Sequence, residues 1–147
     1  MFKHVFLPTD GSPLCAEGVT KAIAFAASIG ARVTAFHARP TYPDMRHGET
    51  GVMAPVTPEG HQAQMEDKAK QLLAGVAAQC AKAGVACETL SVVNDYPAKA
   101  IVQLAQEVGA DLIAMASHGR SGLNALLMGS ETRSVLTRTH LPVLVFK

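Results

Sequence analysis

The sequence lacks the segments that carry a protein into or across a membrane. None of its apolar runs reaches the roughly twenty residues that a helix needs to cross a bilayer. The opening residues, MFKHVFLPTDGS, also lack the long apolar stretch and the small-residue cleavage site of a signal peptide. We therefore expect no membrane partner and predict a cytoplasmic protein.

The sequence also lacks an excess of charge of either sign and a cysteine spacing typical of a paired site. The formal net charge is +1 and lysine and arginine form no cluster, which argues against a nucleic-acid partner. Cys15, Cys80 and Cys87 are odd in number and form no Cys-x-x-Cys pair. This pattern favours buried thiols in a reducing compartment over metal or redox ligands. The histidines show no metal-ligand spacing either.

The chain does contain enough apolar material for one folded domain. Apolar residues make up 48% of the composition and charged residues 17%, which is typical of a globular protein. Its 147 residues suit one hydrophobic core, so we expect a single domain over residues 1–147.

Hydrophobic periodicity predicts alternating strands and helices. Short apolar or β-branched runs predict strands at 4–9, 32–38, 86–93, 111–116 and 142–146. Apolar residues that recur every three or four positions predict helices at 13–30, 65–84, 97–109 and from 130 onward. Capping residues and closing glycines support these limits. The order βαβαβαβαβ predicts an α/β fold with an open doubly wound parallel sheet, Rossmann-like, of five strands and four helices.

One connection is much longer than the others. The segment Arg39–Gly60 holds four of the eight prolines and shows no periodicity. It exceeds the roughly 12 residues of an ordinary connection, so we expect a lid, a flexible insert or a binding loop.

Two chemically distinctive segments follow predicted strands. PTDGS comes after the first strand and ASHGRSG after the fourth. Open parallel sheets bind ligands outside the carboxyl ends of their strands, where the strand order reverses. If these two strands are neighbours, both segments face one crevice.

The glycine-rich stretch MASHGRSGLNALLMGSE, Met115–Glu131, suits an anion held by backbone N–H groups. Gly119, Gly122 and Gly129 allow a close approach, and Ser130 begins a helix whose free N–H groups favour phosphate. The GxxxxGK[ST] motif is absent, and Arg120 is the only cation that the sequence places nearby. Spacing alone leaves a structural turn equally open.

The roles of Asp10 and His118 can each be interpreted in two ways. Asp10 could accept hydrogen bonds from a ribose hydroxyl or help to hold a metal, or it could form a local Asx-turn. His118 suggests a general base, yet the sequence places no carboxylate, serine or cysteine partner for it. A histidine that steadies the loop backbone is favoured.

Taken together, these segments resemble the universal stress protein (UspA) family. The resemblance rests on PTDGS, the alternating order, MASHGRSGLNALLMGSE and the closing PVLVF, and it covers the whole chain. It implies a doubly wound α/β fold and a homodimer paired through the last strand, Pro142–Phe146. One branch of the family binds ATP through a Gly-x2-Gly-x9-Gly-Ser/Thr loop, and another branch lacks the loop.

Position by position, Gly119 matches the second glycine of that loop, Gly129 and Ser130 match its final pair, and Ala116 stands at its first glycine. Asp10 matches the acidic residue that contacts the nucleotide. By the same resemblance, Ala38 is expected to line the adenine pocket, with Met115 and Val143 as candidates for its base-side and nearby walls. The nucleotide site implied by the resemblance comprises Pro8, Thr9, Asp10, Ala38, Met115, Ala116, His118, Gly119, Arg120, Gly129, Ser130, Glu131, Thr132 and Val143.

Two of these residues depart from the pattern or complicate it. Ala116 costs about 1–2 kcal/mol if the position needs a left-handed backbone, which weakens binding roughly tenfold. It costs almost nothing in an ordinary strand, which the preceding DLIAM favours. The carboxylate of Glu131 suits a helix start but repels phosphate unless it points away or meets Mg²⁺.

Three functions remain open from the sequence. The first is a module for stress response or signalling that binds ATP, with ADP or AMP as alternatives, and acts through a nucleotide-dependent dimer on unidentified protein partners. The second is a nucleotide-free dimeric interaction protein with a vestigial loop. The third is a weak ATP hydrolase, although no catalytic residue is assigned.

Overall fold

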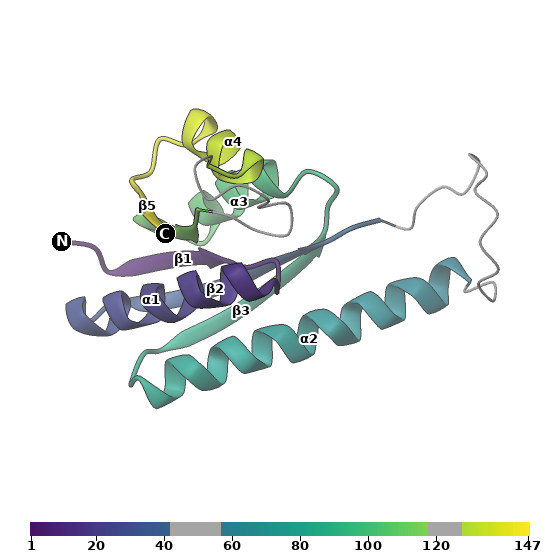
Figure 1. Cartoon of the computed structure of the whole chain (residues 1–147), viewed down its shortest axis with the longest axis horizontal. Coiled ribbons are helices and arrows are strands. Elements are labelled where there is room, and N and C mark those ends of the chain that lie inside the picture. The colour runs from purple at the N-terminus through teal and green to yellow at the C-terminus, as the bar shows by residue number, and fades with distance from the viewer. Residues whose placement is uncertain (42–56, 118–127) are drawn as a thin grey trace.

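The chain folds into the predicted alternation of strands and helices (Figure 1). The computed structural model describes residues 1–41, 57–117 and 128–147. Its elements are β1 His4–Pro8, α1 Pro13–Ile29, β2 Arg32–Arg39, α2 Pro58–Lys82, β3 Cys87–Val93, α3 Pro97–Glu107, β4 Leu112–Ala116, α4 Ser130–Arg138 and β5 Val143–Phe146.

All five strands are parallel and form one sheet in the order β3-β2-β1-β4-β5. The chain first winds outward from β1 to β3 and then returns to add β4 on the other side of β1. The strand order therefore reverses at β1, which confirms the doubly wound fold and places the first and fourth strands side by side.

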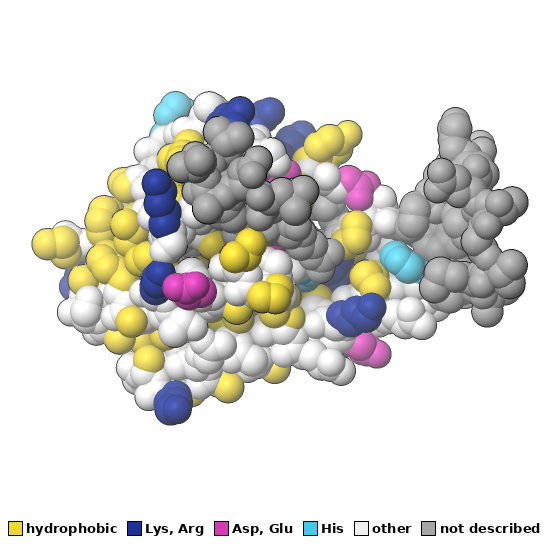
Figure 2. All heavy atoms as spheres, in the orientation of Figure 1, with side chains coloured by type: hydrophobic (Ala, Val, Ile, Leu, Met, Phe, Trp, Pro, Cys, Tyr) yellow, Lys and Arg dark blue, Asp and Glu magenta, His cyan; other side chains and the backbone are white. Residues whose placement is uncertain are grey.

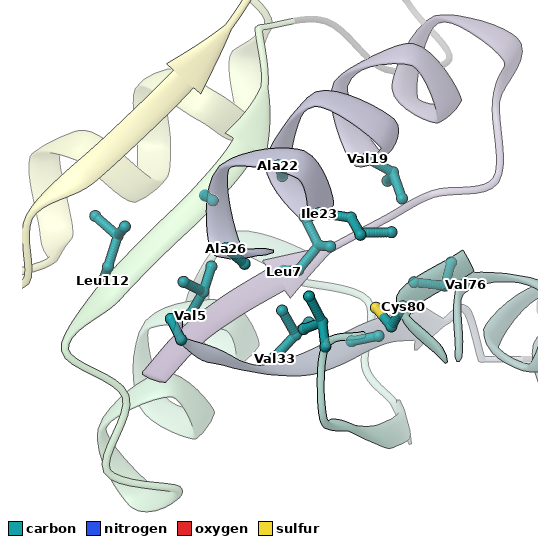
Figure 3. Close-up of a cluster of buried hydrophobic side chains, with 14 of the residues drawn as sticks. Val5, Leu7, Val19, Ala22, Ile23, Ala26, Val33, Val76, Cys80 and Leu112 are labelled. Atoms are coloured by element: carbon teal, nitrogen blue, oxygen red, sulfur yellow. The ribbon is translucent and has the colours of Figure 1, made fainter. Parts of the chain in front are cut away.

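Helices cover both faces of the sheet, and alternate strand residues face each layer. Val5, Leu7 and Val33 point to the face covered by α1 and α2, where they join a buried cluster with Ile23 and Val76 (Figure 3). Phe6, between Val5 and Leu7 on β1, and Phe36 on β2 point to the α3 and α4 face, with ring centroids 5.3 Å apart. This burial on both faces explains why the strands read as nearly continuous apolar runs.

Local capping signals set the start of the first helix. Ser12 accepts a hydrogen bond from the backbone N–H of Cys15 at 3.2 Å, and Pro13 occupies the first turn. Gly30 ends the helix with φ of 65°, a left-handed conformation that glycine adopts without strain. The predicted limits of this helix are confirmed.

The second helix begins earlier than predicted, which corrects the end of the expected loop 39–60. Thr57 accepts a hydrogen bond from the N–H of Gly60 at 3.1 Å, and Pro58 lies in the first turn of α2. Proline suits that position because it needs no N–H partner there. Residues 58–60 are therefore helical, and residues 42–56 lie outside the described part of the chain.

In the described part of the chain, none of the helices combines the length and apolar character needed to cross a membrane.

In Figure 1 the first turns of α2 extend past the carboxyl ends of the strands, beyond the edge where β1 and β4 finish.

Candidate nucleotide site

A cavity of about 410 Å³ opens at the carboxyl ends of the central strands. Its walls come from the turn after β1, from the end of β2, from the end of β4 and from the first turn of α4. Because β1 and β4 are neighbours, Pro8, Thr9 and Asp10 of the first distinctive segment line the same cavity as Ala116, the first residue of the second. Its volume lies in the range of small-molecule sites.

Most of the sequence-predicted site residues line this cavity. They are Pro8, Thr9, Asp10, Ala38, Met115, Ala116, Gly129, Ser130, Glu131 and Thr132. His118, Gly119 and Arg120 lie outside the described residues. Val143 is not among the lining residues; on β5 it packs against the buried cluster of the α3 and α4 face.

The turn after β1 is held by a network of local hydrogen bonds. Oδ1 of Asp10 accepts from the N–H of Ser12 at 2.9 Å, and Oγ1 of Thr9 accepts from the N–H of Gly11 at 3.2 Å. Nδ1 of His37 lies 2.8 Å from the carbonyl oxygen of Thr9, which ties this turn to β2. Asp10 thus forms the Asx-turn and also lines the cavity, so a structural role in the turn is compatible with a role in ligand binding.

Cys15 supplies an uncharged wall beneath the same turn. It is 5% exposed, and its thiol donates to Oγ1 of Thr9 at 3.5 Å. Burial raises the pKa of the Cys15 thiol above its ordinary value of 9.0. The group is therefore a neutral thiol at physiological pH.

Ala116 lies at the end of β4 in ordinary strand conformation. No non-glycine residue in the described part of the chain has a positive φ, so the left-handed penalty does not apply to it. Its Cβ packs against Gly18 of α1, where an added Cβ would stand only 2.7 Å away. The methyl group of Ala116 thus occupies space that a glycine on the facing helix leaves free.

Gly129 and Ser130 form the start of α4 at the cavity wall. Gly129 is the N-cap residue, with φ of −56° and ψ of 149°, and its N–H donates to the carbonyl oxygen of Ser117 at 2.8 Å. The first N–H groups of a helix have no partner within the helix, and the helix dipole gives this end positive character. The arrangement suits an anionic group.

Thr132 and Glu131 are turned toward protein partners. Oγ1 of Thr132 is buried and donates to the carbonyl oxygen of Ala116 at 3.1 Å, which fixes α4 against the end of β4. Oε2 of Glu131 accepts from the N–H of Ala98 at 2.9 Å, at the start of α3. The repulsion expected between Glu131 and phosphate is therefore reduced, since this oxygen is engaged by a neighbouring helix.

Sequence reasoning missed the wall that α2 contributes. Met65 and Lys68 line the cavity from this helix, and Arg39 lines it from the end of β2. The sequence indicated only Arg120 near the glycine-rich stretch, so Lys68 and Arg39 are cations of the cavity that linear spacing did not indicate. The spacing of residues in the sequence did not indicate that Lys68 lines the cavity, because only tertiary packing places this part of α2 beside the strand ends.

The turn between β3 and α3 closes another side. Asn94 and Asp95 both line the cavity. The carboxylate of Asp95 accepts from the N–H of Thr41 at 2.8 Å and also from its hydroxyl, and these bonds lower the pKa of Asp95. The contact joins the exit of β2 to the start of α3. Within the described residues, no group of three or more His, Cys, Asp and Glu side chains is arranged to hold a metal ion.

Comparison with known proteins identifies the family. The model of the universal stress protein family matches residues 1–147. The chain belongs to the universal stress protein family. Universal stress protein MJ0531 of Methanocaldococcus jannaschii is 31% identical over 147 residues, which span all of this chain and 83% of that protein. A universal stress protein of Thermus aquaticus is 32% identical over the full length of both chains.

Solved universal stress protein structures have the same fold. The structure of MJ0577 from M. jannaschii matches with a TM-score of 0.82 and 26% identity, covering 100% of this chain and 96% of that one. A universal stress protein in complex with cAMP matches with a TM-score of 0.70 and 25% identity, covering 99% and 96%. The shared fold places the equivalent strand ends at the same edge of the sheet in each protein.

Proposed function

We propose that this universal stress protein binds an adenine nucleotide, with ATP as the first candidate and ADP or AMP as alternatives, at the cavity beside β1 and β4. The observation that carries the proposal is the meeting of three features at one cavity: the Asp10 turn, the end of β2 and the first turn of α4. The complex of a related universal stress protein with cAMP supports an adenine nucleotide as the ligand.

The end of β2 suits the adenine base. The register of β1 with β2 ends at Pro8 opposite Phe36, and the carbonyl oxygen of Phe36 accepts from the N–H of Thr9 at 2.8 Å. In a parallel pair, every second residue directs its N–H and C=O to the same neighbour. The peptide groups of Ala38 are therefore directed past the end of β1, where a base edge can meet a donor and an acceptor.

The opposite side of the cavity suits the phosphates. The N-terminus of α4 offers backbone N–H groups, and the absence of a side chain at Gly129 leaves room beside them. Asp10 also lines this cavity, and its carboxylate is the proposed acceptor for a ribose hydroxyl. Mg²⁺ with the phosphates is a further element of the proposal, and Lys68 adds a positive charge at the rim.

The proposed action is that of a cytoplasmic module for stress response or signalling, in which the nucleotide alters contacts of a homodimer with protein partners. The edge strand β5 supports the dimer, since no strand in the described part of the chain pairs with its outer side. Figure 2 shows hydrophobic side chains gathered at the end of the molecule where Figure 1 places β5 and the N-terminus.

Calorimetric titration of nucleotide-stripped protein tests the proposal. We expect ATP to bind with micromolar affinity, and binding to weaken at least tenfold in Asp10→Asn and in Gly129→Val. The asparagine keeps an oxygen for the Asx-turn but removes the charge. Valine tolerates the φ and ψ of Gly129, so it adds bulk to the cavity without straining the backbone.

Gly75→Val is the matched control, because a Cβ at Gly75 of α2 meets no atom within 4 Å. It should bind ATP as the wild type does. No binding of ATP, ADP or AMP by the wild type would contradict the proposal and favour the nucleotide-free interaction protein. ATP turnover that His118→Ala abolishes while binding survives would favour the weak hydrolase.

A further inference from the structure

Two of the three cysteines, Cys80 and Cys87, lie outside the lining of the nucleotide cavity. Cys80 is in the last turn of α2, and Cys87 is the first residue of β3. The chain reverses between them, because the N–H of Val85 donates to the carbonyl oxygen of Cys80 at 2.9 Å. Cys87 then pairs with Val33 of β2, on the face of the sheet that α2 covers.

The side chains meet at the edge of the same buried cluster. Cys80 is completely buried and points from α2 toward the sheet (Figure 3), whereas Cys87 packs against the cluster and stays partly exposed. Both side chains therefore border one cluster, and Cys87 is close enough to Cys80 to raise the pKa of the Cys80 thiol. Cys87 also donates to the carbonyl oxygen of Glu88 at 3.5 Å.

From this placement we infer that Cys80 and Cys87 form a reversible dithiol–disulfide pair, a redox modification site whose oxidant is a low-molecular-weight disulfide. A disulfide needs two Cβ atoms that face each other at short range, and the reversal after α2 brings both cysteines to the edge of one cluster. The inference is independent of nucleotide binding, since neither residue lines the cavity.

The reaction proceeds by two thiol–disulfide exchanges. The thiolate of Cys87 attacks one sulfur of the small disulfide, breaks its S–S bond and releases one small thiol, which leaves a mixed disulfide on Cys87. The thiolate of Cys80 then attacks the Cys87 sulfur, forms the Cys80–Cys87 bond and releases the second small thiol. The protein loses two protons and two electrons, and the small disulfide gains them as two thiols.

The order of the two steps follows from exposure and ionisation. Cys87 is the accessible thiol, so the small disulfide reaches it first. Burial and the neighbouring Cys87 raise the pKa of Cys80 to about 12, so Cys80 reacts poorly with oxidants in solution. Its attack is restricted to a sulfur already held beside it.

Peptide mapping tests the inference directly. Trypsin cleaves after Lys70, Lys82 and Lys99, and because Lys82 lies between the two cysteines, they fall on different peptides. Native protein treated with oxidised glutathione and digested without reduction should give peptide 71–82 joined to peptide 83–99. Its intact mass should fall by two hydrogen atoms, and dithiothreitol should restore it.

Single variants separate the two steps. Cys80→Ser should stop at a stable glutathione adduct on Cys87, and Cys87→Ser should leave Cys80 unmodified. Cys15→Ser, the control, should form the linked peptide as the wild type does. The inference is overturned if the native protein accumulates only the glutathione adduct, if Cys15 enters the crosslink, or if the linked peptide forms only after unfolding in urea.

Discussion

At the scale of single residues, one close contact joins α1 to β4 beside the cavity. Gly18 of α1 faces Ala116 of β4, the residue at the position where the family loop has its first glycine. An alanine in a helix interior is ordinarily about 1 kcal/mol more stable than a glycine. At Gly18 this preference is reversed, because a new Cβ would stand 2.7 Å from that of Ala116 and 3.1 Å from its Cα.

We expect Gly18→Ala to lower the free energy of unfolding by about 1–2 kcal/mol, through overpacking that outweighs the gain in helix propensity. In an Ala116→Gly background the same substitution should be neutral or stabilising. Urea unfolding of the four proteins measures this coupling as a double-mutant cycle.

Gly75→Ala controls for helix propensity, because an added Cβ at Gly75 meets nothing within 4 Å. It should stabilise the protein by up to about 1 kcal/mol. Equal effects of Gly18→Ala in the wild-type and Ala116→Gly backgrounds would show that the two positions do not compete for space.

A second prediction at the residue scale concerns His4, which is buried in β1 with Nε2 2.8 Å from Oγ1 of Thr34. Burial and the positive charge of Arg32 lower the pKa of His4 below its ordinary value of 6.5. The unfolded chain therefore binds the proton more readily than the folded one. The stabilising contribution of neutral His4 is fully present above pH 6.5 and is lost as the pH falls toward the folded pKa.

The free energy of unfolding, measured in urea, should thus decrease between pH 7.5 and pH 5.5 by more in the wild type than in His4→Gln. The pKa of His4, followed by NMR, should lie below 6.5. Equal decreases in the two proteins would remove His4 as the source.

At the scale of elements, α3 depends on α4 for its N-terminus. Tyr96 at the N-cap of α3 makes no side-chain capping bond, and Glu131 of α4 accepts from the N–H of Ala98 instead. Ala98 is buried, so its N–H would be left without a partner if the carboxylate were removed. A negative charge at this place also suits the dipole of α3.

We expect Glu131→Ala to lower the free energy of unfolding by about 1–2 kcal/mol. Glu131→Gln should lose less, because the amide oxygen can still accept. Glu107→Ala is the control: it removes a 2.7 Å bond from Gln103 on the exposed side of α3 and should change stability by less than about 0.5 kcal/mol. Equal losses in Glu131→Ala and Glu107→Ala would contradict the capping role.

At the scale of the whole molecule, the outer side of β5 is the proposed dimer contact. The carbonyl oxygens of Pro142 and Phe146 accept from Ile113 and Ser117 on the β4 side. By alternation, the N–H and C=O groups of Val143 and Val145 are directed to the outer edge. Val145→Pro therefore removes an outward N–H and leaves the bonds to β4 intact.

Light scattering should give a dimer for the wild type and for Val145→Ile, and a monomer for Val145→Pro. Isoleucine is the control because it keeps both the N–H and the apolar surface. A wild-type monomer at micromolar concentration would overturn the dimer itself, whereas a dimeric Val145→Pro would place the contact elsewhere.

The sequence by itself determined the elements and their order. Burial on both faces of the sheet made the central strands recognisable as short apolar runs, while Ser12, Pro13 and Gly30 marked the limits of α1 through local backbone chemistry. The start of α2 was misread, because Pro58 looks like a loop residue unless Thr57 is seen to cap the helix. Capping signals of this kind involve residues only a few positions apart, so they can be recognised from the sequence alone.

Only the tertiary structure decided how the site is assembled. It placed β4 beside β1, brought Lys68 of α2 to the cavity and turned Glu131 toward α3. It also put Ala116 in strand conformation against Gly18, where its methyl group fits. These outcomes join residues distant in the chain, and they follow from packing two helical layers on a twisted sheet, which no local spacing encodes.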